Sequence, residues 1–256
     1  MKRKLFISLM SIIFIFSSIM FFKDIWQRYQ DENRFEILRN KIEKQSSTNK
    51  NDFKNIEENT DKELQILPQY KDIIEINDEF VGWIEIENTK INYPVMQTPN
   101  NEEYYLHRNF KKEYSVSGTP FLSAKSLIYD SNNQIVIYGH NMKNGTMFSD
   151  LLLYKDKEFW KNNSIIFLDT MYNRKKFEVF AAFEIDAEIG NGHFEFYKYS
   201  TFRDNDEFKA FLKEIEALSL YNTEIDINFG ETILTLVTCD KENSSNRMVV
   251  MGVEKN

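Results

Sequence analysis

The sequence predicts a mostly β, α+β domain with a barrel-like sheet, placed behind a hydrophobic N-terminal segment. From about residue 69 onward, short runs of alternating apolar and polar residues recur, which is typical of strands with two different faces. Two longer stretches with helical periodicity interrupt these runs. Many short strands with two helical insertions indicate a barrel-like α+β fold. A hydrophobic content of 42% and an aromatic content of 15% are ample for a packed core.

The N-terminal segment has the properties of a membrane anchor. Lys2, Arg3 and Lys4 are basic, and residues 5–22 then run without a charge. As a helix this run is about 27 Å long, roughly the thickness of a hydrocarbon core. A basic flank of this kind stays on the cytoplasmic side. A cleaved signal peptide is the alternative, but it has a shorter apolar core and a small-x-small cleavage site, which this segment lacks. We therefore expect a cytoplasmic tail at 1–4, a signal-anchor at 5–22, and an extracellular remainder.

Residues 23–68 are expected to form a juxtamembrane helical and linker region before a domain at 69–256. Apolar residues recur near helical spacing in its first half. The following stretch, residues 46–63, is rich in Asn, Ser, Lys and Glu and reads as a loose spacer. Disorder over the whole region is the alternative interpretation. The apolar positions of the predicted helix are Ile25, Trp26, Tyr29, Phe35, Leu38 and Ile42.

The strands of the domain are predicted from their alternation and their β-branched residues. The first contains Val81, Trp83, Ile84 and Ile86, with Gly82 near a bend. The other candidates are residues 119–123, 134–138, 164–169, 176–185, 232–238 and 247–253.

Two segments, residues 146–162 and 203–220, have helical periodicity. In the second, Asp204 or Asn205 is suited to cap the helix start. One face of this helix is apolar and should pack on the sheet. That face contains Phe208, Phe211, Leu212, Ile215 and Leu218.

Charge and cysteine content limit the function classes. The formal net charge is −8, and residues 23–256 carry 29 bases against 40 acids, which argues against nucleic acid as a partner. The single cysteine excludes an internal disulfide, so the thiol is either buried and inert or kept for chemistry. No zinc-type Cys/His spacing and no glycine-rich nucleotide motif is present. We expect no metal and no organic cofactor.

Three residues at predicted strand ends form a candidate catalytic set. Cys239 ends the apolar run "TLVTC", and His140 follows the run "QIVIYG". Arg247 begins the apolar run "RMVVMGV", and a hairpin-like loop should return it to Cys239. A thiol can act as the nucleophile, an imidazole can relay protons, and a guanidinium can stabilise an oxyanion. The alternative is that His140 and Cys239 stand at two unrelated strand ends and have no catalytic role.

Arg247 and the two remaining histidines also have purely structural interpretations. Arg247 can merely pair with Asp240 or Glu242. The remaining histidines, His107 and His193, are expected to be surface or packing residues, because their flanking sequences show no comparable pattern.

These motifs resemble those of the sortases. "TLVTC" is similar to the TLxTC signature of that family, "YGHN" is similar to its catalytic-histidine segment, and Arg247 stands where the family has its arginine. The resemblance covers roughly residues 70–253. Class B is indicated by the N-terminal helical extension and by the helical stretch 204–220 before the cysteine strand. The resemblance implies a closed eight-stranded β-barrel.

The resemblance also implies an activity. Cys239 would attack the carbonyl of Thr in a C-terminal sorting motif of a secreted protein and form a thioacyl enzyme. A peptidoglycan cross-bridge or stem-peptide amine would then accept the acyl group. His140 would transfer protons, and Arg247 would stabilise the oxyanion. The reactive form would be a minority of the enzyme molecules, in which Cys239 is a thiolate and His140 an imidazolium. The enzyme would act at the outer face of the cell membrane.

The resemblance assigns substrate contacts less sharply. It indicates Asn101, Tyr105 and Leu106 in one loop, and Thr238 and Asp240 beside the cysteine. Val237 departs from the family pattern, because class B enzymes often have serine there. Three alternatives stay open: a cysteine hydrolase with the same Cys and His, a sortase that polymerises pilins, and a non-catalytic surface-binding module.

Overall fold

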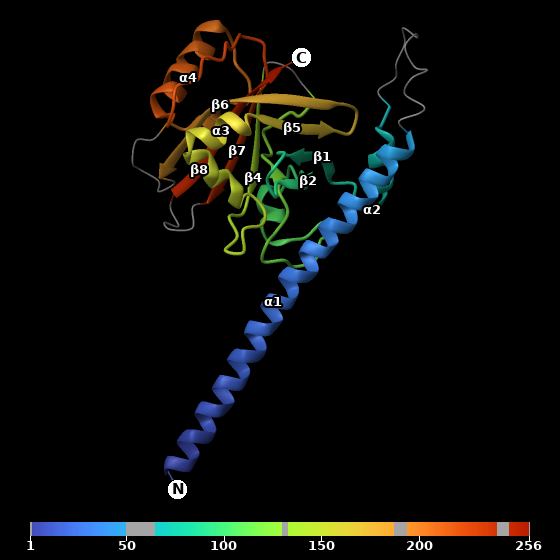
Figure 1. The fold of residues 1–256 in the computed structure, drawn as a ribbon, viewed down its shortest axis with the longest axis vertical. Coiled ribbons are helices and arrows are strands. Elements are labelled where there is room, and N and C mark those ends of the chain that lie inside the picture. Colours follow the sequence, from blue (N-terminus) through green and yellow to red (C-terminus); the bar gives the residue numbers. More distant parts are fainter. Residues whose placement is uncertain (1, 50–64, 130–132, 187–193, 240–245, 256) are drawn as a thin grey trace.

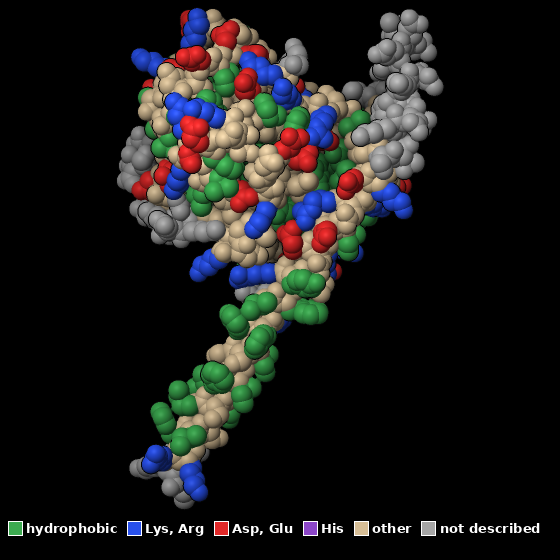
Figure 2. Space-filling model, viewed as in Figure 1, with side chains coloured by type: hydrophobic (Ala, Val, Ile, Leu, Met, Phe, Trp, Pro, Cys, Tyr) green, Lys and Arg blue, Asp and Glu red, His purple; other side chains and the backbone are tan. Residues whose placement is uncertain are grey.

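The computed structural model describes residues 2–49, 65–129, 133–186, 194–239 and 246–255. It consists of one long N-terminal helix, α1 (Lys2–Asn49), and a β-barrel that lies beside the C-terminal half of that helix (Figure 1). The N-terminal half of α1 extends away from the barrel, and hydrophobic side chains cover much of its surface (Figure 2).

Eight strands close the barrel, as the resemblance implied. Their order around the barrel is β1-β2-β3-β4-β7-β8-β6-β5. The pairs β2/β3 and β4/β7 are parallel, and the other described pairs are antiparallel. The strands are β1 (Phe80–Glu85), β2 (Asn92–Met96), β3 (Phe121–Leu122), β4 (Gln134–Gly139), β5 (Ile165–Thr170), β6 (Arg174–Asp186), β7 (Ile233–Cys239) and β8 (Asn246–Lys255).

The predicted strands are confirmed, with two differences. β2 was not predicted as a separate strand, although it pairs with β1 over its whole length. β3 has only two residues instead of the five expected. Pro120 precedes it, and proline has no N–H with which to extend a ladder. The carbonyl of Pro120 still accepts a hydrogen bond from Met96 N.

The two predicted helical segments are also present. The first becomes a 3-10 helix, η4 (Ser149–Lys155), followed by α3 (Lys157–Asn162). The second is α4 (Asn205–Leu218), in which the Asp204 side chain caps the helix by accepting from Glu207 N. Four short helices complete the fold: η2 (Pro68–Tyr70), α2 (Lys71–Ile76), η3 (Glu102–His107) and η5 (Phe196–Lys198).

Two hydrophobic clusters hold the sheet from its two sides. The larger one contains residues from β1, β2, β4, β5 and β6 together with Phe35 and Leu38 of α1. The smaller one packs Phe208, Phe211 and Ile215 of α4 against β4, β6, β7 and β8. Strands β4 and β7 are thus buried on both faces, which fixes their ends.

α1 joins the predicted anchor and the predicted juxtamembrane helix into one element. It is the one helix in the described part of the chain that is long and apolar enough to cross a membrane. Of its predicted apolar positions, Phe35 and Leu38 are buried against the barrel, whereas Ile25, Trp26 and Tyr29 are exposed. Most of the expected spacer, residues 50–63, lies outside the described residues.

Candidate active site

Strand pairing brings the three candidate catalytic positions to one end of the barrel. β4 and β7 run parallel with Gly139 beside Thr238, so the next residues along the two strands are His140 and Cys239. β7 and β8 run antiparallel with Cys239 opposite Arg247. The prediction that these residues come from neighbouring strand ends is therefore confirmed for the backbone.

A tight packing contact fixes the chain where β4 ends. The backbone of Gly139 lies so close to the ring of Phe148 that an added Cβ would stand 2.7 Å from that ring. Phe148 is fully buried, and its N–H donates to the carbonyl of His140 at 2.9 Å. Glycine is therefore required at 139, and the loop that returns at Phe148 holds the His140 backbone in place.

The imidazole of His140 is held by a backbone carbonyl. Its Nε2 lies 2.9 Å from the carbonyl oxygen of Leu106, in η3. A carbonyl oxygen only accepts, so Nε2 carries the hydrogen in this contact. In the neutral ring the lone pair is therefore on Nδ1, which is the nitrogen that can take up or deliver a proton.

The surroundings of His140 disfavour its charged form. Burial lowers its pKa most, and the nearby charges of His107 and Arg247 lower it further. The hydrogen bond to Leu106 opposes this shift in part. A histidine with a lowered pKa is mostly neutral near pH 7, and its imidazolium form is a readier proton donor.

His107 lies against the catalytic candidate, which sequence reasoning missed. Its exposed ring is 5.5 Å from the ring of His140, with a tilt of 30° between the planes. The surface location of His107 agrees with the prediction, but the flanking sequence gave no sign of its neighbour. His193, the third histidine, lies outside the described residues.

Arg247 is half-buried at the second position of β8, and one of its guanidinium nitrogens donates to the carbonyl of Asn246 at 3.1 Å. Its effect on the pKa of His140 places its charge near the imidazole. Asp240 and Glu242, the ion-pair partners that a purely structural role of Arg247 would use, lie outside the described residues.

The expected substrate-contacting residues differ in their surroundings. Asn101 is exposed just before η3, and Leu106 is half-buried with its carbonyl on His140. Tyr105 is fully buried, and its hydroxyl binds Asn77 and Glu79. Contact between Tyr105 and a substrate would thus need this network to open.

Next to the cysteine position, β7 is buried. Thr238 is 1% exposed, and its hydroxyl has no hydrogen-bond partner among the residues that the structure describes. The same holds for the side-chain amide of Asn141, which follows His140. Val237 belongs to the smaller hydrophobic cluster, under α4. Unsatisfied polar groups therefore flank His140 and Cys239.

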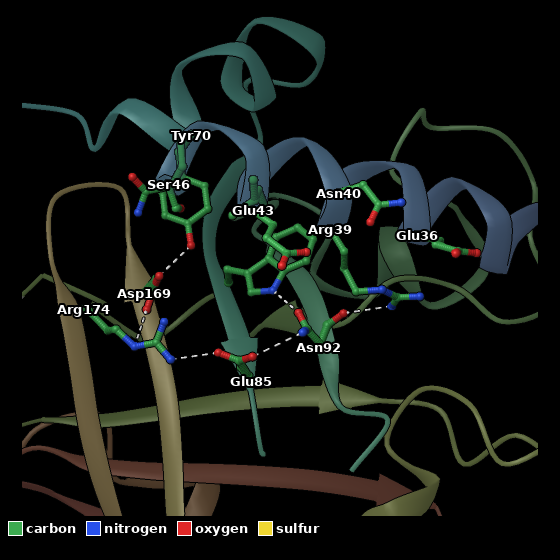
Figure 3. Close-up of a pocket in the computed structure, with 13 residues that line it drawn as sticks. Glu36, Arg39, Asn40, Glu43, Ser46, Tyr70, Glu85, Asn92, Asp169 and Arg174 are labelled. Atoms are coloured by element: carbon green, nitrogen blue, oxygen red, sulfur yellow. Dashed lines mark hydrogen bonds and ion pairs between the residues drawn. The ribbon is translucent and has the colours of Figure 1, made fainter. Parts of the chain in front are cut away.

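A separate pocket of about 520 Å³ lies between α1 and the barrel. Its polar groups bind one another (Figure 3): Tyr70 donates to Asp169 at 2.6 Å, Arg174 pairs with Glu85 at 2.8 Å, and Asn92 donates to Glu85. Burial raises the pKa of Asp169. Because these polar groups form hydrogen bonds and ion pairs with one another, we interpret the pocket as a polar contact between α1 and the barrel. It is separate from the strand ends that carry His140 and Arg247.

Comparison with known proteins agrees with this arrangement. The family model for the sortase domain matches residues 84–255. The chain is 30% identical to sortase B of Listeria monocytogenes over 190 residues, which are 73% of this chain and 74% of that protein. It is 26% identical to sortase B of Staphylococcus aureus, over 100% of this chain and 98% of that protein. The solved Staphylococcus aureus sortase B–substrate complex has the same fold, with a TM-score of 0.75 at 24% identity, covering 90% of this chain and 99% of that one.

Proposed function

Because the chain belongs to the sortase family as a class B member, and sortases are cysteine transpeptidases, we propose a specific reaction for it. The enzyme cleaves a C-terminal sorting motif of secreted proteins after Thr. It then transfers the acyl group to an amine of the peptidoglycan cross-bridge or stem peptide. The observation that carries this proposal is the pairing of Cys239 with Arg247 beside the strand that leads into His140.

In the first half of the proposed reaction, the Cys239 thiolate attacks the Thr carbonyl carbon and a C–S bond forms. The Arg247 guanidinium stabilises the oxyanion of the tetrahedral intermediate. When the C–N bond breaks, the imidazolium of His140 gives its Nδ1 proton to the leaving amine. The products are a thioacyl enzyme and a free C-terminal peptide.

In the second half, the acceptor amine attacks the thioester carbonyl. His140 takes the proton that this amine loses, and the C–S bond breaks to restore the thiolate. Since Nε2 is held by Leu106, one nitrogen can serve both proton transfers without a ring flip. The hydroxyl of Thr238 and the amide of Asn141 have no hydrogen-bond partner among the described residues, so they are candidate donors and acceptors for the substrate backbone if substrate entry uncovers them.

We also propose that α1 anchors the enzyme with its N-terminus in the cytoplasm and the barrel outside. The support is the uncharged run at residues 5–22 behind a basic flank, together with the exposure of its apolar side chains. A domain division at 1–4, 5–22, 23–68 and 69–256 follows from this placement.

The test uses the full chain in detergent with a fluorescence-quenched sorting-motif peptide and an added amine acceptor. Wild type should cleave the peptide, and the amine should divert the product from acid to amide. Cys239→Ala should do neither. Acid as the sole product with every natural amine would favour a hydrolase, and a preference for a protein Lys amine would favour pilin polymerisation. Equal cleavage by Cys239→Ala would sink the proposed mechanism.

A further inference from the structure

We propose that the loop of residues 108–117 is a membrane-contacting surface, which rests on the headgroup layer of the bilayer that α1 crosses. This loop is called the membrane-side loop below. The inference rests on the proposed membrane anchor and adds a second, peripheral contact. Its partner is the outer lipid surface, and its function is to fix the height and orientation of the active site.

Among the barrel groups that contact α1, those of this loop lie closest to the uncharged run of the helix. Going up the helix from the uncharged run, the barrel groups met are first those of the membrane-side loop, then β2, then α2. The contacts in this order are Gln27 to Tyr114, Asp31 to Ser115, Arg34 to Glu113, Phe35 to Tyr93, Arg39 to Asn92, and Gln45 to Asp72.

The first of these contacts fixes the height of the loop. Gln27 Nε2 donates to the carbonyl of Tyr114 at 2.6 Å. Gln27 follows Phe22, the last residue of the uncharged run, by five positions, or about 7.5 Å of helix. Each headgroup layer is about 5–8 Å thick. The tip of the loop therefore stands at the height of the headgroups when residues 5–22 fill the hydrocarbon core.

The side chains at this height suit a membrane interface. Tyr114 is 62% exposed, which makes it the most exposed large apolar residue in the described part of the chain after residue 64. Trp26 and Tyr29 of α1 are 64% and 59% exposed. Tyrosine and tryptophan concentrate at membrane–water interfaces, where their rings meet both apolar and polar surroundings. A fully aqueous location would leave all three rings largely exposed to water.

The charges near the loop are compatible with an anionic lipid surface. Lys23 and Lys111 are exposed. The carboxylate of Glu113 in the same loop is paired with Arg34 at 2.6 Å. Figure 2 shows Lys and Arg side chains where α1 meets the lower edge of the barrel. Basic groups close to an anionic leaflet each add a modest attraction.

The membrane-side loop is directly connected to the active site. Ser115 N donates to the carbonyl of His107, and Thr119 N donates to that of Tyr105, so the loop is bonded to η3. η3 in turn carries the carbonyl of Leu106 that holds His140. A membrane contact through the loop would place this wall of the active site at the lipid surface, where it can meet a substrate that arrives along the membrane.

The test measures the depth of single nitroxide labels in the full chain, reconstituted in phosphatidylcholine vesicles with and without phosphatidylglycerol. A Cys239→Ser background leaves one labelled cysteine per variant. Tyr114→Cys and Lys111→Cys report on the loop, and Ile13→Cys reports on the anchor. Tyr129→Cys is the matched control, because Tyr129 is 48% exposed and contacts Tyr172. The adjacent Met171 accepts from Leu67 N, in the segment that leads into α2, which is the element that meets α1 farthest from the uncharged run.

We expect collisions of a water-soluble nickel complex with the labels at 114 and 111 to fall on transfer from detergent to vesicles. Those with the label at 129 should not change, and the label at 13 should be shielded from nickel. Phosphatidylglycerol should strengthen the loss at 111. If 13 is shielded while 114 and 111 remain as accessible as 129, the loop contact is wrong and the anchor stands. If 13 is accessible as well, both fail. The proposed reaction is tested separately, by peptide cleavage with the wild-type enzyme, and does not depend on either result.

Discussion

At the scale of single residues, the proposed reaction depends on how His140 is held. The Leu106 carbonyl fixes one nitrogen, and burial, together with the nearby His107 and Arg247, lowers the pKa of the imidazole. These contacts make His140 neutral in most molecules near pH 7. The small imidazolium fraction is then a stronger acid toward the leaving amine.

Replacing His107 should therefore change the pH dependence of the reaction. His107→Gln removes one of the groups that lower the pKa of His140, so that pKa should rise. The acidic limb of the kcat/KM profile, which reports the protonation of His140, should move to higher pH. A full pH–rate profile checks this. The control is Tyr197→Phe, a change on the exposed surface of η5. A profile unchanged in His107→Gln would mean that the two rings are not electrostatically coupled.

Arg247→Lys separates charge from geometry. Lysine keeps the positive charge near His140 but loses the planar fork of donors. We expect kcat to fall at least ~10²-fold, the lower range for loss of an oxyanion donor, while the pH profile keeps its shape. Arg247→Gln should lower kcat as well and also shift the acidic limb upward, because it removes a charge that lowers the pKa of His140. Near-normal turnover of Arg247→Lys would assign Arg247 a structural role.

Sequence reasoning placed His140, Cys239 and Arg247 at neighbouring strand ends, because reactive residue types stand there at the ends of apolar runs, and the strand pairing agrees with these positions. It missed the contact that uses the backbone. The Leu106 carbonyl could not be found in this way, because every residue has a carbonyl and its partner is 34 positions away. His107 was overlooked for the same reason: its proximity to His140 arises from the packing of η3.

At the scale of elements, the contact between α1 and the membrane-side loop contains a buried carboxylate. Asp31 is 2% exposed and accepts a hydrogen bond from Ser115 Oγ at 2.6 Å. Asn109 donates to it at 3.4 Å, and Arg34 lies 3.6 Å away. The same Ser115 oxygen accepts from the backbone N–H groups of Ser117 and Gly118. The carboxylate therefore connects the helix to the loop that supports η3.

Asp31→Ala should destabilise the protein and weaken catalysis together. The change leaves buried donors without an acceptor, at a cost of about 1–3 kcal/mol. At roughly 2–4 °C per kcal/mol for a domain of this size, the midpoint of thermal unfolding should fall by several degrees. Asp31→Asn should recover part of the loss, since its amide oxygen can still accept from Ser115. Glu36→Ala, five residues further along α1 at an exposed position, is the matched control and should have little effect. Equal midpoints for Asp31→Ala and Glu36→Ala would contradict the role of this contact.

Most elements could be predicted because their patterns are local. α4 shows both its cap and its apolar face in the sequence, and the long strands show alternation. β2 was harder, since Pro94 stands inside it and proline argues against a strand interior. Asp31 gave no signal at all, because an acidic residue on a polar stretch of helix usually faces water. Its burial follows from the docking of α1 on the barrel, which is a tertiary event.

At the scale of the whole molecule, the barrel is a frame that brings distant segments to one edge. His140 and Cys239 are 99 positions apart in the sequence, yet parallel pairing of β4 and β7 places them at adjacent strand ends. Alternation alone predicted a barrel-like sheet, whereas its closure and its eight strands came from the family resemblance. The order of strands around a barrel depends on long-range pairing, which no local pattern encodes.

If Cys239 carries the acyl group during transfer, mass spectrometry of the digested protein should find that group on the peptide that contains Cys239. The full chain is incubated with a sorting-motif peptide without an amine, quenched in acid and digested. We expect an added mass equal to the acyl fragment ending in Thr, located on Cys239, absent in Cys239→Ala and removed when an amine is supplied. Peptide cleavage with no adduct, or with the adduct on another residue, would contradict it.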